Sequence, residues 1–136
     1  MIIKMRMFLI LVGLLVVSAC GQESLNAQHE VYLSNKGWEI KESIEIETHK
    51  VDIPDEILNN YEASGITFLR KYLGQEVTQH FYELHEEDFE GKHVKAVVFE
   101  AEGEIIGSYG VLPSRDPGVF NLDDKERLIN EQMIKR

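Results

Sequence analysis

The sequence predicts a small α+β domain in which two helices pack on one face of an antiparallel sheet of about four strands, in the order α-β-α-β-β-β. Three patterns lead to this fold class. Apolar and polar residues alternate over residues 38–51, a helical pattern follows Pro54, and two strand patterns flank a turn at Gly103. An apolar content of 43% is typical of a folded domain and too high for a disordered chain.

The first two elements are a short helix over residues 24–36 and a strand over residues 38–51. Ser24 is suited to the N-cap of the helix, and Gly37 to the left-handed position after its end. The strand alternates with period 2, so one face is predicted to be buried. That face is made by Trp38, Ile40, Ile44 and Ile46.

A second helix is predicted over residues 52–65. Pro54 stands where the first helical residue is expected, and the acidic residues after it favour the positive end of a helix. Ile57, Leu58 and Tyr61 line one side of this helix. The next stretch indicates a shorter turn that ends near Gly74.

The rest of the domain is predicted to be strands. Residues 76–87 form one, and residues 93–113 form a β-hairpin around Gly103. Apolar residues occupy both faces over 94–99, which is typical of a central strand covered on both sides. The folded domain is expected to span residues 30–122. The tail, 123–136, has the pattern of a short helix or of a frayed end.

Residues 1–19 have the pattern of a secretory signal peptide. Lys4 and Arg6 precede the run "MFLILVGLLVV", residues 7–17. A helix of these 11 residues is about 16 Å long, roughly half the thickness of the hydrocarbon layer. A permanent transmembrane span is therefore not expected.

The leader ends in "VSAC", which contains the only cysteine of the chain. Val17, Ser18, Ala19 and Cys20 resemble the lipobox of bacterial lipoproteins: an aliphatic residue, two small residues and a cysteine. The resemblance implies that the Cys20 thiol receives a diacylglyceryl group, with acyl chains such as palmitate, and that the signal peptidase cuts before Cys20. Residues 20–29 would then be the lipidated N-terminus and a short tether. The alternative is a buried free thiol behind an ordinary signal peptide.

Three short segments of the exported part resemble an uncharacterised family of small domains found in Gram-positive lipoproteins. They are "YLSNKGWEI" (32–40), "VDIPDEILNNYE" (51–62) and "KAVVFEAEGEIIGS" (95–108), and the resemblance covers residues 30–122. The chain departs from the family at residues 70–75 and at 107–109. The family contributes no catalytic residue.

The charge of the chain disfavours two classes of partner. The formal net charge is −10, and it becomes −12 once Lys4 and Arg6 leave with the leader. Nucleic acids bind basic clusters, and anionic lipids attract polybasic segments, so neither partner is expected. The dispersed acidic residues indicate a solvated surface.

Several segments are candidate sites. "HFYELHEED", 80–88, could supply metal ligands, but His80 and His85 point to opposite faces of a strand, so a charged strand end is favoured. "EEDFEG", 86–91, lacks the spacing of a calcium loop. "GSYGVLPSRDPG", 107–118, is a candidate binding loop or a plain connection. Trp38 is expected in the core. Metal, cofactor and catalytic residues are not predicted.

The sequence therefore predicts a lipid-anchored protein on the outer, extracytoplasmic face of the cell membrane. Because no catalytic constellation such as G-x-S-x-G is visible, a non-catalytic binding or interaction module is favoured over an enzyme. Its partner would be an envelope protein or a small ligand. The alternatives are a regulator or inhibitor of an envelope enzyme and, less favoured, a small envelope enzyme.

Overall fold

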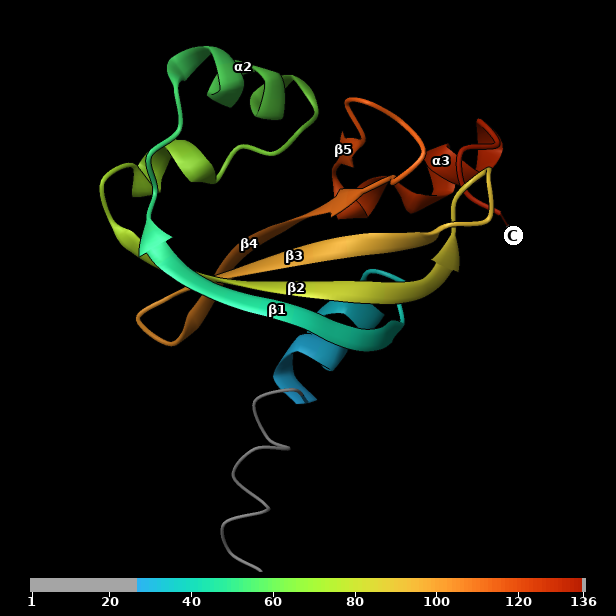
Figure 1. Cartoon of the computed structure of the whole chain (residues 1–136), viewed down its shortest axis with the longest axis horizontal. Helices are drawn as coiled ribbons and strands as arrows, with labels where there is room; N and C mark the ends of the chain where they lie inside the picture. Colours follow the sequence, from blue (N-terminus) through green and yellow to red (C-terminus); the bar gives the residue numbers. More distant parts are fainter. Residues whose placement is uncertain (1–26, 136) are drawn as a thin grey trace, which may run out of the picture. The chain divides into compact units, whose positions relative to one another are not determined.

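The structure is a computed structural model, and it describes residues 27–135 (Figure 1). The chain divides into two compact units, Met1–Tyr32 and Leu33–Arg136. In the first unit the described residues, 27–32, are helical. In the second unit, residues 33–35 are helical and Gly37 follows them with a φ of 89°. The start of the predicted helix at Ser24 lies outside the described residues.

One antiparallel sheet of five strands forms the body of the second unit (Figure 1). The strands follow one another across the sheet in chain order, so each is joined to its neighbour without a crossover. They are β1 (Ile40–Lys50), β2 (Glu76–Glu87), β3 (His93–Ala101), β4 (Glu104–Val111) and β5 (Val119–Phe120). The α+β class with an antiparallel sheet is thereby confirmed.

The β3–β4 hairpin has the turn that the sequence predicts. Glu102 and Gly103 connect the strands, with φ values of 53° and 79°. Two left-handed residues in a two-residue loop match the right-handed twist of the flanking strands. β3 is the central strand, and residues 96–99 are at most 2% exposed, as expected for a strand covered on both faces.

One face of the sheet is covered by α2 (Asp55–Ala63) and the 3-10 helix η1 (Leu69–Tyr72). Pro54 was expected to be the first residue of this helix. It is instead the N-cap of α2, which begins at Asp55. Gly65 follows the helix with a φ of 86°. The core on this face joins the two helices to β2 and β3. Its fully buried residues are Val51, Leu58, Ile66, Leu69, Val77, Val97 and Phe99.

On the opposite face of the sheet, Phe120 of the β5 segment packs against Gly110 and Trp38. A Cβ atom at Gly110 would lie 2.2 Å from the Phe120 ring, and the rings of Trp38 and Phe120 are 5.7 Å apart. This segment continues into η2 (Leu122–Asp124) and α3 (Lys125–Asn130). Trp38 is 1% exposed, so its predicted core position is confirmed.

The structure corrects the predicted sheet and helix counts. The sheet has five strands rather than about four, because β5 pairs Val119 with Val111 and Phe120 with Gly110. Two residues are too few to show a period-2 pattern. Within residues 27–135 there are three α-helices rather than two: the helical residues 27–35, α2 and α3.

The prediction that Trp38, Ile40, Ile44 and Ile46 form one buried face is wrong for two of these four residues. Ile44 and Ile46 are 49% and 60% exposed. β1 is an edge strand, and its register against β2 shifts between Ile40 and Glu42 and again between Ser43 and Glu45. These bulges interrupt the alternation that the sequence pattern assumes.

Candidate functional site

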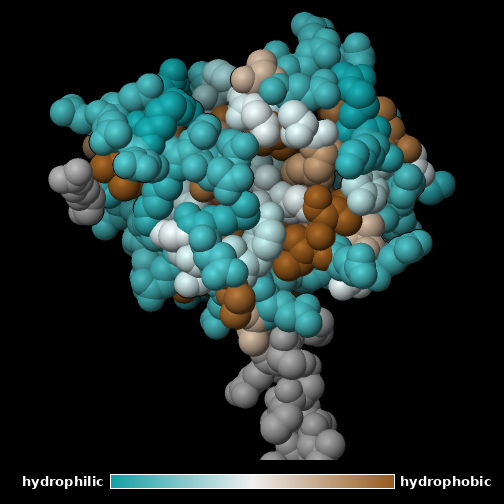
Figure 2. All heavy atoms as spheres, turned by 180° about the vertical axis from the view of Figure 1, so that it is seen from behind, coloured by the Kyte–Doolittle hydropathy of each residue, from teal (hydrophilic) through white to brown (hydrophobic). Residues whose placement is uncertain are grey.

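The predicted lipidation site, Val17, Ser18, Ala19 and Cys20, lies outside the described residues. Within residues 27–135, the helices are too short or too polar to cross a bilayer. The structure therefore bears on what residues 27–135 present to their surroundings. Figure 2 shows that hydrophilic side chains cover most of one side of the protein, with a group of apolar side chains near the middle.

A first hollow lies between α2 and the segment before β5. It has a volume of about 200 Å³. Pro117 comes from the predicted binding loop, whose residues 107–111 belong to β4. Ile57, predicted to line the inner side of its helix, is 45% exposed here. The complete lining is Ile57, Asn60, Tyr61, Ser64, Pro117 and Val119.

Two polar side chains at this first hollow, Ser64 and Tyr61, contact other groups of the protein. The Ser64 hydroxyl donates to the Asn60 carbonyl at 3.3 Å. The rings of Tyr61 and Tyr109 lie 5.4 Å apart. Burial raises the pKa of Tyr109, and its contact with Tyr61 raises it further, so this phenol is neutral at physiological pH. The hollow is suited to an apolar side chain rather than to acid–base chemistry.

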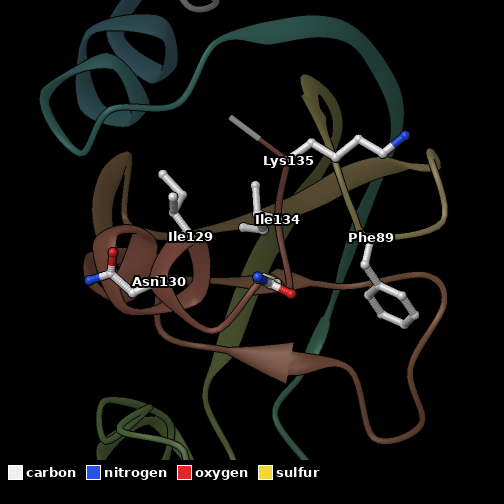
Figure 3. A pocket seen from close by; sticks show the side chains of 6 residues that line it. Phe89, Ile129, Asn130, Ile134 and Lys135 are labelled. Atoms are coloured by element: carbon white, nitrogen blue, oxygen red, sulfur yellow. The ribbon is translucent and has the colours of Figure 1, made fainter.

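A second hollow, of about 470 Å³, lies beside α3 and the C-terminal segment (Figure 3). That segment pairs with the turn after β2: the Phe89 amide donates to Met133 at 3.1 Å, and the Lys135 amide donates to Glu87 at 3.0 Å. Asn130 and Lys135 point to opposite sides of the hollow, and the Phe89 ring stands apart from Ile129. The polar side chains do not converge on one point, as those of a small-molecule site do.

The acidic turn considered for calcium is organised around a buried carboxylate. Asp88 is 0% exposed. Its Oδ1 accepts the amides of Glu90 and Lys92, and its Oδ2 accepts the amide of Ser114, each at 3.0 Å. Burial raises the pKa of Asp88, but these hydrogen bonds outweigh it and hold the pKa below its ordinary value. The carboxylate ties the turn to the loop after β4.

The two histidines of residues 80–88, the segment considered for metal binding, lie apart. His80 Nε2 lies 3.5 Å from Glu100 Oε2 on β3, and its ring stacks with Tyr82 at 6.3 Å. His85 instead lines a separate surface hollow with Glu86, Glu87 and Lys135. Within the second unit, His80 and Glu100 bring two potential metal ligands together. Sequence reasoning did not find Glu100, because the pair depends on the register between β2 and β3.

Sequence reasoning placed Glu42 near a sheet edge or a bulge, as observed, but did not single out the open edge as a site. Among the described strands, β1 has β2 as its only neighbour. All residues of β1 after Ile40 are exposed. An edge strand leaves a row of backbone N–H and C=O groups facing outward, where another extended chain can pair with it. We refer to the outward side of Glu45–Lys50 as the β1 edge.

Comparison of the chain with protein-family models, curated proteins and solved structures found no match in any of the three. The resemblance to a family of small Gram-positive lipoprotein domains therefore stays a proposal. The function has to be argued from the residues themselves.

Proposed function

We propose that this protein is a lipid-anchored, extracytoplasmic binding or interaction module without catalytic activity. The observation that carries the proposal is "VSAC", residues 17–20, placed directly after an 11-residue apolar run and a basic start. In this reading the mature chain begins at Cys20, held on the outer face of the cytoplasmic membrane by a diacylglyceryl thioether.

The physics of lipid anchoring supports this reading. One acyl chain holds a protein at a membrane only marginally, whereas two chains hold it stably, at about 0.8 kcal/mol per buried methylene. A diacylglyceryl group supplies two chains. The net charge of −12 after cleavage opposes adhesion to anionic lipid, so the attachment has to come from the covalent lipid.

A partner-binding role is favoured over catalysis by the described surfaces. The polar side chains at the second hollow point apart, and the Ser64 hydroxyl at the first hollow donates to the Asn60 carbonyl. The β1 edge, by contrast, offers unpaired backbone and the exposed side chain of Ile46, which suit a protein partner. Regulation of an envelope enzyme through this edge is the second candidate.

Membrane fractionation in a bacterial host tests the anchor. Wild type, Cys20→Ser and the control Gln22→Ser are extracted with a detergent that separates into detergent-rich and aqueous phases on warming. We expect wild type and Gln22→Ser in the detergent phase and Cys20→Ser in the aqueous phase or retained with its leader. Protease added to intact protoplasts should degrade the anchored forms. Equal partition of Cys20→Ser and wild type would rule out the lipid as the anchor.

A further inference from the structure

The second half of β1 is the regular part of the exposed sheet edge. After the register shift at Ser43 and Glu45, β1 pairs with β2 without interruption from Glu45↔Phe81 to Lys50↔Glu76. An uninterrupted stretch of six residues is long enough to template one further strand, because natural strands are commonly five to six residues long. The bulges before it limit regular pairing to this half.

The two sides of this stretch have different chemistry. Glu45 and Glu47 lie opposite Phe81 and Gln79, on the face that α2 covers further into the sheet. Ile46 lies opposite His80, on the other face, and is 60% exposed. A strand pairing here would therefore meet carboxylates on one face and an isoleucine on the other.

Glu45 and Glu47 share one face of this stretch, whereas its lysine, Lys50, alternates onto the other face and lies opposite Glu76. A hydrogen bond with Glu47, and the negative charge of that residue, raise the pKa of Glu45. Glu42, just before the stretch, lies opposite another acid, Glu83. A second copy of this chain, paired antiparallel about Glu47, would place the two Glu47 side chains opposite each other, which like-charge repulsion disfavours. Charge complementarity instead selects a basic partner.

We propose that the β1 edge binds an extended, basic segment of a partner protein, which adds a sixth strand to the sheet and places Lys or Arg beside Glu45 and Glu47. The proposal rests on the binding role proposed above and names the partner chemistry. Alternate residues of the bound segment face Ile46, so apolar residues are expected between the basic ones. Backbone pairing supplies affinity, and the alternating side chains supply specificity.

The test uses the full-length protein in detergent micelles and a fluorescein-labelled peptide of alternating lysine and valine, six residues long. A matched peptide has proline in place of each valine. It keeps the charge but loses alternate N–H groups. We expect the lysine–valine peptide to bind with saturation in fluorescence anisotropy and the proline peptide to bind at least about tenfold more weakly, since pairing needs the backbone.

Charge variants locate the site. The double variant Glu45→Lys/Glu47→Lys should weaken peptide binding about tenfold or more. The double variant Glu45→Gln/Glu47→Gln, which removes the charges without reversing them, should weaken it about threefold. The control, Glu56→Lys with Glu104→Lys, changes the net charge equally at exposed positions outside β1 and should stay within about twofold. Circular dichroism checks that each variant is folded. Amide hydrogen exchange should slow in β1 when the lysine–valine peptide is present.

Four results would overturn the proposal: no binding, equal binding of the proline peptide, equal loss in the control variant, or protection confined to residues outside β1. Self-association through β1, in place of peptide binding, would also overturn it. An intact mass of the same preparation reports separately whether Cys20 carries lipid. A lipidated protein that fails the peptide test would lose its assigned partner surface and keep its anchor.

Discussion

The indole N–H of Trp38 donates a 2.8 Å hydrogen bond to the carbonyl of Leu122, 84 residues further along the chain. The contact joins the segment before β1 to the segment after β5. Lys125 lies over the same indole, 4.8 Å from its centroid, and also donates to the Gly37 carbonyl. The residues after β5 are thus packed into the second unit.

Trp38→Phe should lower the free energy of unfolding by about 1–3 kcal/mol, because it leaves the Leu122 carbonyl buried without its donor. Urea unfolding followed by circular dichroism measures the loss. Phe89→Leu, at a side chain 41% exposed, is the control and should change stability by about 0.5 kcal/mol or less. Equal stability of Trp38→Phe and wild type would show that the indole N–H contributes nothing to the fold.

Asp88→Asn should destabilise the protein by about 1–3 kcal/mol at neutral pH, because an amide nitrogen would face backbone N–H donors. The effect should depend on pH. A carboxylate with a lowered pKa stabilises the fold above its unfolded pKa and loses that contribution as the pH falls through the folded pKa.

The difference between wild type and Asp88→Asn should therefore shrink below the ordinary aspartate pKa of 3.8. Urea unfolding at pH 7 and at about pH 3 measures it, with the exposed Asp52→Asn as the control. A difference that stays constant over this range would contradict the role assigned to the Asp88 carboxylate.

Gly107→Ala should cost about 1–3 kcal/mol, because a Cβ atom there would lie 2.4 Å from carbons of the Phe68 ring. Phe68 itself packs edge-on against Phe99, with ring centroids 5.1 Å apart, so it has little room to move. Phe68→Leu in the Gly107→Ala background should recover part of the loss. Strict additivity of the two changes in a double-mutant cycle would show that the contact is not the cause.

Ile46→Thr should leave the free energy of unfolding within about 0.5 kcal/mol of wild type, since the side chain is 60% exposed. Leu84→Ala, at a β2 residue that is 0% exposed, should cost about 2–5 kcal/mol. The two variants are compared by urea unfolding under the same conditions. A large loss in Ile46→Thr would mean that β1 is covered on this side in solution.

Strong local patterns made much of the fold predictable. The bounds of β2 match the predicted strand at both ends, and the β3–β4 turn falls at Gly103 as expected. The apolar run in β3 indicated a central strand correctly. β5 escaped prediction because it is two residues long and pairs only through tertiary context.

The β1 edge could not be predicted from the sequence as a candidate partner surface. The alternation over β1 indicated a buried face, but whether such a face is covered depends on the strand's place in the sheet. Once β1 lies at an edge and carries two bulges, Ile44 and Ile46 become surface residues. The proposed lipobox is different, because it is a short linear sequence, residues 17–20, whose recognition needs no fold around it.

The mass of the intact protein from a membrane fraction tests the central claim most directly. Wild type should give a chain that begins at Cys20 with the added mass of a diacylglyceryl group, and Cys20→Ser should give an unlipidated or uncleaved chain. An unmodified Cys20 in the wild-type protein would contradict the lipid anchor, and with it the proposal of a module held on the outer face of the membrane.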